Sequence, residues 1–148
     1  MITGALLWSI AVEISPLEST SATFLGVIMS DSNTSIAEIK SIIKEFVDQR
    51  DWQQFHSPKN ISMALAVEAA ELMEHFQWIS MEDSRQVDPQ QLEAIGEEIA
   101  DVFCYTIAMA NSLDLDLTSI FQRKMEKNRQ KYPAAEYQGR FGPDDPGS

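Results

Sequence analysis

The chain has 148 residues, of which 44% are hydrophobic, and a formal net charge of −12 at pH 7. This length suits a single domain with a substantial core. The acidic surplus excludes proteins that bind a nucleic-acid backbone, because too little positive charge is present to neutralise phosphates along a duplex. The one cysteine, Cys104, excludes an internal disulfide, and we expect it to be a small core residue in a reducing cytoplasm.

Residues 1–28 differ in composition from the rest of the chain. They contain an apolar stretch, residues 5–12, but no lysine or arginine. A secretory signal needs a basic leader and a membrane-spanning helix needs about 20 apolar residues, so neither is predicted. Met29 precedes a polar run and has the features of an alternative natural start. We therefore expect residues 1–30 to be a disordered or non-native extension.

Four helices are predicted, and the first two have clear start signals. Ser35 and Glu38 form a capping box, which predicts a helix over residues 36–50. Ser57-Pro58 combines an N-cap residue with proline at the first helical position. It predicts a second helix that continues to about Ile79.

The last two predicted helices begin in a similar way. Asp88-Pro89, with Gln91 at the capping-box position, predicts a third helix that ends at about Ser112. An aspartate, Asp114 or Asp116, begins a fourth helix, which ends just before the next proline.

The fold class predicted from these elements is all-α, because no strand-like alternation of useful length is present. We expect a four-helix bundle over residues 31–133, followed by a C-terminal tail, residues 134–148. Residues 102–110 are almost wholly apolar, which is typical of a helix buried all round. One small bundle cannot cover such a helix on every side, so we expect part of it to contact another subunit in a homodimer or homotetramer.

Two acidic pairs lie on the second and third predicted helices: Glu68 with Glu71, and Glu98 with Asp101. Residues three apart lie on one helix face, so each pair points one way. Glu68 falls near the centre of the apolar stripe of its helix, and the second pair directly precedes the apolar run. Carboxylates in such positions are costly unless a cation binds them. An all-oxygen set favours Mg²⁺ or Mn²⁺ over zinc.

Two other classes of protein could carry such acids. In a non-catalytic helical interaction protein they would merely keep the bundle soluble. A di-metal carboxylate oxidoreductase would need Glu-x-x-His on its helices, whereas Leu72 and Gln53 stand three residues before His75 and His56. A P-loop and the His-Glu-x-x-His zinc motif are absent from the sequence, which excludes P-loop enzymes and disfavours zinc proteases.

Aromatic and basic side chains accompany the acids. Exposed or half-exposed aromatic rings can stack on a nucleobase, although core packing is the ordinary role of a tryptophan. Lys124 and Asn128 share a helix face that suits contact with phosphate oxygens, and a solvated helix end is the alternative. Acids for a metal, rings for a base and cations for phosphates together suggest a nucleoside triphosphate. The aromatic candidates are Trp52, Phe55, His56, Trp78 and Tyr105.

Five sequence segments, taken in their order along the chain, resemble motifs of the all-α nucleotide pyrophosphohydrolases of the MazG superfamily, above all its dCTP pyrophosphatase branch. The resemblance covers roughly residues 36–133. It is carried by the segments Arg50-Asp51-Trp52-Gln53-Gln54-Phe55-His56-x-Pro58-Lys59-Asn60, Glu68-x-x-Glu71, Phe76-Gln77-Trp78, Glu97-Glu98-x-x-Asp101 and Lys124-Met125-x-x-Asn128-x-x-Lys131-Tyr132-Pro133.

The resemblance implies a housecleaning hydrolase that cleaves dCTP, or a related or modified dNTP, between its α- and β-phosphates. The products would be the monophosphate and pyrophosphate. The four acids would bind Mg²⁺, and Glu71 or Glu98 would accept the proton of the attacking water. Family members form dimers or tetramers with sites between subunits, which agrees with the apolar third helix.

The resemblance also implies which residues bind the nucleotide. Those that would line the nucleotide pocket or lie near the phosphates are Trp52, His56, Trp78, Tyr105, Lys124 and Asn128. One position departs from the pattern of the dCTP-specific relatives, in which a histidine on the first helix helps to bind the nucleotide. The aligned residue here is Ile43, which leaves the preferred base open.

Overall fold

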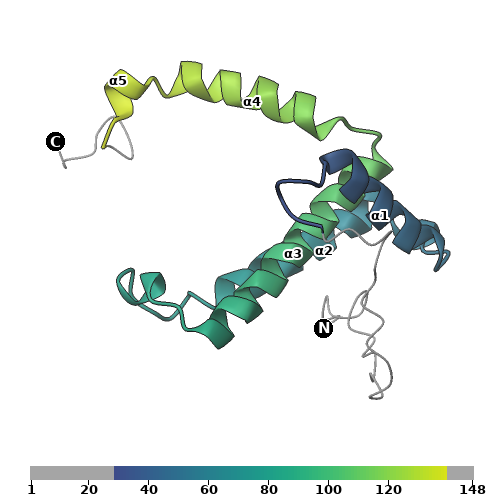
Figure 1. The fold of residues 1–148 in the computed structure, drawn as a ribbon, viewed down its shortest axis with the longest axis horizontal. Coiled ribbons are helices and arrows are strands. Elements are labelled where there is room, and N and C mark those ends of the chain that lie inside the picture. Colours follow the sequence, from purple (N-terminus) through teal and green to yellow (C-terminus); the bar gives the residue numbers. More distant parts are fainter. Residues whose placement is uncertain (1–28, 140–148) are drawn as a thin grey trace. The chain divides into compact units, whose positions relative to one another are not determined.

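The computed structural model describes residues 29–139. This part of the chain contains helices and no strands, which confirms the all-α prediction (Figure 1). The chain divides into two compact units, one ending at Leu113 and one beginning at Asp114. The predicted four-helix bundle therefore has its first three helices in one unit and its fourth in the other. Residues 1–28 of the extension predicted over residues 1–30 lie outside the described residues.

The first helix, α1 (Ile36–Asp48), begins with the predicted capping box. The Glu38 amide donates to Ser35 Oγ at 3.2 Å, and the Ser35 amide donates to Glu38 Oε2 at 2.7 Å. The helix ends slightly before the predicted Arg50, because the chain reverses there. Asp51 adopts a left-handed φ of 52°, and the Trp52 amide donates to the Val47 carbonyl at 3.1 Å.

The second helix, α2 (Pro58–Glu74), starts as predicted, with the Asn60 amide donating to Ser57 Oγ at 3.2 Å. Its predicted end at Ile79 is wrong. The Phe76 and Gln77 amides both donate to the Met73 carbonyl, each at 3.0 Å, so the last turn tightens and closes. Ser80 Oγ then accepts a hydrogen bond from the Asp83 amide, in the turn that leads into the short 3₁₀ helix η3 (Asp83–Arg85). These local bonds compete with continuation of α2.

The third helix, α3 (Pro89–Ser112), has the predicted bounds, and Asp88 caps it by accepting from the Gln90 and Gln91 amides, both at 2.9 Å. It makes its main contacts with α2 and α1. The expectation that residues 102–110 are buried all round is wrong for the single chain at Phe103, which is 39% exposed. The two neighbouring helices cover only part of the surface of α3, and Ile99, one turn before Phe103, is 53% exposed.

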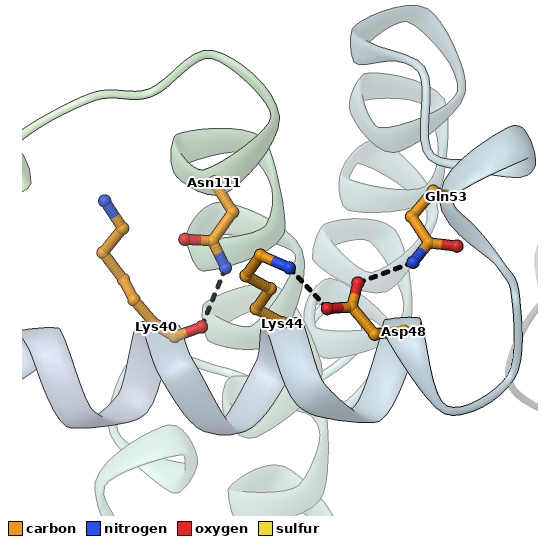
Figure 2. A network of polar contacts seen from close by, with 5 residues as sticks. All are labelled: Lys40, Lys44, Asp48, Gln53 and Asn111. Atoms are coloured by element: carbon orange, nitrogen blue, oxygen red, sulfur yellow. Dashed lines mark hydrogen bonds and ion pairs between the residues drawn. The ribbon is translucent and has the colours of Figure 1, made fainter.

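The core of the first unit lies where α3 meets α1 and α2. Its buried hydrophobic residues are Ile43, Val47, Ile61, Ala64, Ile95, Tyr105, Ile107, Ala108 and Ala110. Polar bonds support the packing (Figure 2): Asn111 Nδ2 donates to the Lys40 carbonyl at 2.9 Å and joins α3 to α1. Asp48 pairs with Lys44 and accepts from Gln53 Nε2 at 2.6 Å, which joins α1 to the 3₁₀ helix η2 (Gln53–Phe55).

The second unit contains α4 (Leu117–Lys131) and α5 (Ala134–Tyr137). Of the two predicted caps, Asp116 begins α4, since it accepts from the Ser119 amide at 3.1 Å. The short α5 falls in the predicted tail, and its Tyr137 packs edge to face on Tyr132, which follows α4, at 5.3 Å between ring centroids. Among the described helices, none has the length and apolar character that crossing a membrane requires.

Candidate metal centre and nucleotide site

Three of the four predicted metal ligands converge across the contact between α2 and α3. One carboxylate oxygen from each of Glu68, Glu98 and Asp101 lies within 4.8 Å of the others. Glu68 is only 5% exposed, whereas Glu98 and Asp101 are half-buried. The spacing within each helix places each acid on the inward face, and the packing of the two helices brings the faces together.

The surroundings of these acids oppose their negative charge. Burial, followed by the charges of Glu71, Asp101 and Glu98, raises the pKa of Glu68 to about 7. Burial is also the main cause that raises the pKa of Glu98 and of Asp101. Because a carboxylate with a raised pKa holds a proton more tightly, a proton and a metal cation compete for this cluster near neutral pH.

Glu71, the fourth predicted ligand, lies beside the compact group and is not a member of it. It is half-buried, and its charge is the largest charge effect on the pKa of both Glu68 and Glu98. Its carboxylate is therefore close to the cluster. Glu74, further along α2, is exposed.

The chemistry of the acid cluster suits a divalent cation. Within residues 29–139, Glu98 Oε2 is buried and has no hydrogen-bond partner. Leaving a buried polar atom unpaired costs about 1–3 kcal/mol, and more for a charged group. A bound cation would remove this cost and offset the repulsion between the acids. Carboxylate oxygens are the ligands that Mg²⁺ and Mn²⁺ prefer.

Two further residues lie next to the acids. Tyr105 is buried, and its pKa is raised first by burial and then by the charges of Glu68 and Asp101, so it lies near these two acids. His75 was missed by sequence reasoning, yet its charge lowers the pKa of Glu98. The available signal was its spacing, since His75 follows Glu71 by four residues on the same helix face.

A second group of predicted residues meets at the connection between α1 and α2. The Trp52 and His56 rings stack with centroids 6.4 Å apart and planes 14° apart. Phe46 packs against Trp52 edge to face at 5.9 Å. The Arg50 guanidinium lies 3.5 Å above the Phe46 ring centroid and donates to the Phe46 carbonyl at 3.0 Å. Sequence reasoning did not assign Phe46 or Arg50 to the site.

The remaining predicted residues are dispersed. Trp78 is 87% exposed in the segment between α2 and η3. Lys124 is exposed and Asn128 is half-buried on α4, in the second unit, which is described separately from the acid cluster. Ile43, where the resemblance expects a histidine in dCTP-specific relatives, is a core residue with 8% exposure.

Comparison with known proteins bears on the identity of this chain. The model of the MazG-like family matches residues 63–140, which is more than half of the sequence and includes both acidic pairs. The chain belongs to the MazG-like family. The matched range does not include Trp52 and His56.

The sequence of this MazG-like protein is also similar to those of named pyrophosphatases. It is 37% identical over 118 residues to the dCTP pyrophosphatase 1 of Bos taurus, covering 78% of this chain and 69% of the relative. It is 41% identical over 101 residues to that of Rattus norvegicus, covering 67% of this chain and 59% of the relative. It thus spans only about three fifths of the rat protein.

A solved structure supports the fold of the MazG-like chain. A pyrophosphatase from Archaeoglobus fulgidus matches with a TM-score of 0.64 and 34% sequence identity. The match covers 72% of this chain and 99% of the archaeal chain.

Proposed function

We propose that this protein is a Mg²⁺-dependent pyrophosphohydrolase that converts dCTP, or a related or modified dNTP, to the monophosphate and pyrophosphate. The enzyme class, a nucleoside triphosphate pyrophosphohydrolase, follows from the family and from the dCTP pyrophosphatases among its relatives. The single observation that supports the chemistry is the convergence of Glu68, Glu98 and Asp101, whose oxygens lie within 4.8 Å of one another.

In this proposal Glu68, Glu98 and Asp101 hold the cation, and Glu71 lies beside them. When bound, the cation supplies positive charge that neutralises the phosphate oxygens as the transition state forms. Mn²⁺ suits the same oxygen donors. The buried position of Glu68 keeps water away from one side of the cluster, which strengthens these electrostatic interactions.

The proposed reaction is direct attack of water on the α-phosphorus. A bond forms between the water oxygen and the α-phosphorus, and the bond from that phosphorus to the bridging oxygen breaks, which releases pyrophosphate. A carboxylate accepts the proton of the water. Glu71 is suited to this because it lies outside the compact group, and Glu98 is suited because its pKa is raised.

The nucleotide would be held by residues outside the acid cluster. We propose that Trp52, His56, Trp78 and Tyr105 line the nucleotide pocket and that Lys124 and Asn128 lie near the phosphates. We also propose a homodimer or homotetramer, because Ile99 and Phe103 expose apolar surface on α3. The support for these assignments is the order of the motifs and the proximity of Trp52 to His56.

Product analysis tests the reaction directly. We expect purified protein with Mg²⁺ to convert dCTP to dCMP and pyrophosphate, which chromatography and a pyrophosphatase-coupled phosphate assay distinguish from dCDP and phosphate. The Asp101→Asn variant should lose at least about a hundredfold in kcat, since it weakens the hold on the cation. Glu74→Gln, an exposed acid on α2, should leave kcat unchanged.

Two outcomes contradict the proposed function. Formation of dCDP would show cleavage at the wrong phosphate bond. If the acids served only to keep a helical interaction protein soluble, Mg²⁺ and nucleotide together would leave its melting temperature unchanged. A ligand present at about 100 times its Kd should instead stabilise the fold by about 2.7 kcal/mol.

A further inference from the structure

His75 lies on the same face of α2 as the acidic pair of that helix. It follows Glu71 by four residues and Glu68 by seven, and helical periodicity places residues at these spacings in one stripe. His75 is the C-cap residue of α2, and its backbone is still helical, with φ −61° and ψ −22°. The side chains of Glu71 and His75 are both half-buried. An imidazole, which can bind a metal through nitrogen, therefore extends the row of acids along α2.

Glu98, on α3, is near both Glu71 and His75. Burial is the main cause that raises the pKa of Glu98, the charge of Glu71 raises it further, and the charge of His75 lowers it. The charge of His75 is not among the causes that shift the pKa of Glu68 or of Asp101. His75 is therefore closer to Glu98 than to the other two members of the acid cluster.

The side chains of Glu71, His75 and Glu98 are available to a ligand. Within residues 29–139, none of the three makes a hydrogen bond or an ion pair, and Glu98 Oε2 is buried without a partner. Glu98 gives one oxygen to the compact group with Glu68 and Asp101, which leaves its other oxygen for a second ion. Rotation about the side-chain bonds of Glu71 and His75 would bring both groups onto an ion beside Glu98.

We propose that Glu71, His75 and Glu98 form a second cation site, which shares Glu98 with the acid cluster and prefers a first-row transition-metal ion such as Mn²⁺ over Mg²⁺. Mg²⁺ strongly favours oxygen ligands, whereas an imidazole nitrogen suits transition-metal ions. The compact group of Glu68, Glu98 and Asp101 offers oxygen alone. The two positions would therefore differ in the metal that they select.

This inference deepens the proposed function and rests on it, because Glu98 is also a ligand of the first cation. Two cations about 3.5–4 Å apart are common in enzymes that cleave phosphate bonds, where they stabilise both the attacking and the leaving oxygen. Glu71 has two carboxylate oxygens, so binding the ion through one leaves the other to accept the proton of water.

Binding of Mn²⁺ in the presence of Mg²⁺ tests this site. Metal-stripped protein would be titrated with Mn²⁺ at one fixed pH, in an excess of Mg²⁺ that fills the all-oxygen cluster. Electron paramagnetic resonance counts the Mn²⁺ that remains free, and its spin-echo form detects nitrogen bound directly to the ion. His75→Gln and Glu71→Gln alter the second site, whereas Asp101→Asn alters the first. Glu74→Gln, at the exposed neighbour of His75, is the matched control.

We expect the wild type to bind one Mn²⁺ per chain under these conditions and to give the nitrogen signal. His75→Gln should weaken this binding by at least about tenfold and abolish the signal, because the nitrogen ligand is lost. Glu71→Gln should weaken binding and keep the signal, and Asp101→Asn and Glu74→Gln should keep both. The sequence has one other histidine, so His56→Gln should also keep the signal.

The nitrogen signal or full Mn²⁺ affinity in His75→Gln would overturn the inference, and so would a wild type that binds no Mn²⁺ in excess Mg²⁺. If circular dichroism shows that His75→Gln does not fold, the signal in His56→Gln decides instead, because the chain has only these two histidines. Binding of Mn²⁺ through nitrogen without hydrolysis of dCTP would support this site and contradict the proposed function. Hydrolysis without the second Mn²⁺ would do the opposite.

Discussion

At the scale of single residues, Glu68 is a carboxylate in surroundings that oppose its charge. It is 5% exposed and faces two other acids, and its pKa is raised to about 7. Without a cation, the folded state must either keep a proton on this cluster or accept repulsion between buried charges. Such a group weakens the fold at neutral pH, and the proposed metal binding would account for keeping it there.

The raised pKa predicts how the stability of the metal-free protein depends on pH. Between the ordinary pKa of 4.5 and the folded value of about 7, the folded state binds more protons than the unfolded state. Stability should therefore fall as the pH rises from about 4.5 to about 7, by up to about 3 kcal/mol. Urea unfolding in EDTA at several pH values measures this change.

The variant Glu68→Gln is the control for this prediction, because the amide does not titrate. Its stability should change less over the same pH range and should exceed that of the wild type at about pH 8 without metal. Added Mg²⁺ should stabilise the wild type most at the upper end of this range, where it displaces the fewest protons. A wild-type stability that stays level or rises over this range would contradict the assigned pKa of Glu68.

At the scale of elements, local hydrogen bonds decide where the helices begin and end. The starts of α1, α2, α3 and α4 depend on single cap residues that the sequence shows directly. The end of α2 depends on a competition between the continued helix and the bonds around Met73 and Ser80. The apolar pattern through Ile79 favoured the longer helix, and the local bonds decided against it.

The capping box of α1 predicts a measurable loss of stability. Ser35→Ala removes the acceptor for the Glu38 amide and should lower the free energy of unfolding by about 1 kcal/mol. Ser41→Ala is the matched control, since Ser41 is exposed within the same helix and bonds only to the carbonyl one turn back. It should change stability by less than about 0.5 kcal/mol. Equal urea midpoints for the two variants would show that the box does not stabilise α1.

At the scale of the whole molecule, α3 carries apolar surface that the single chain leaves uncovered. Ile99 and Phe103 lie one turn apart on this helix, with 53% and 39% exposure. They flank Asp101 on the helix that also carries Glu98. A second copy of the chain is the proposed cover for this surface, which would bring a subunit contact close to the proposed metal ligands.

Substitution within this surface tests the assembly. We expect the wild type to sediment as a dimer or tetramer and Phe103→Glu to sediment as a smaller species, because the new charge would be desolvated in the contact. Met81→Glu is the control, since Met81 is 82% exposed between α2 and α3. Circular dichroism should show equal helix content in all three proteins. A wild type that sediments as a monomer at micromolar concentration would remove the proposed subunit contact.

The sequence by itself determined the all-α class, the helix starts and the two acidic pairs, because caps and helical periodicity act over only a few residues. It also carried the motifs of the MazG superfamily, which the family match confirms. Only the tertiary structure decided that Glu68 of α2 meets Glu98 and Asp101 of α3, with Glu71 beside them and His75 near Glu98. It also decided the stacking of His56 on Trp52 and the exposure of Phe103. Periodicity sets the direction of a side chain around its own helix, whereas the register between two helices depends on how their surfaces pack.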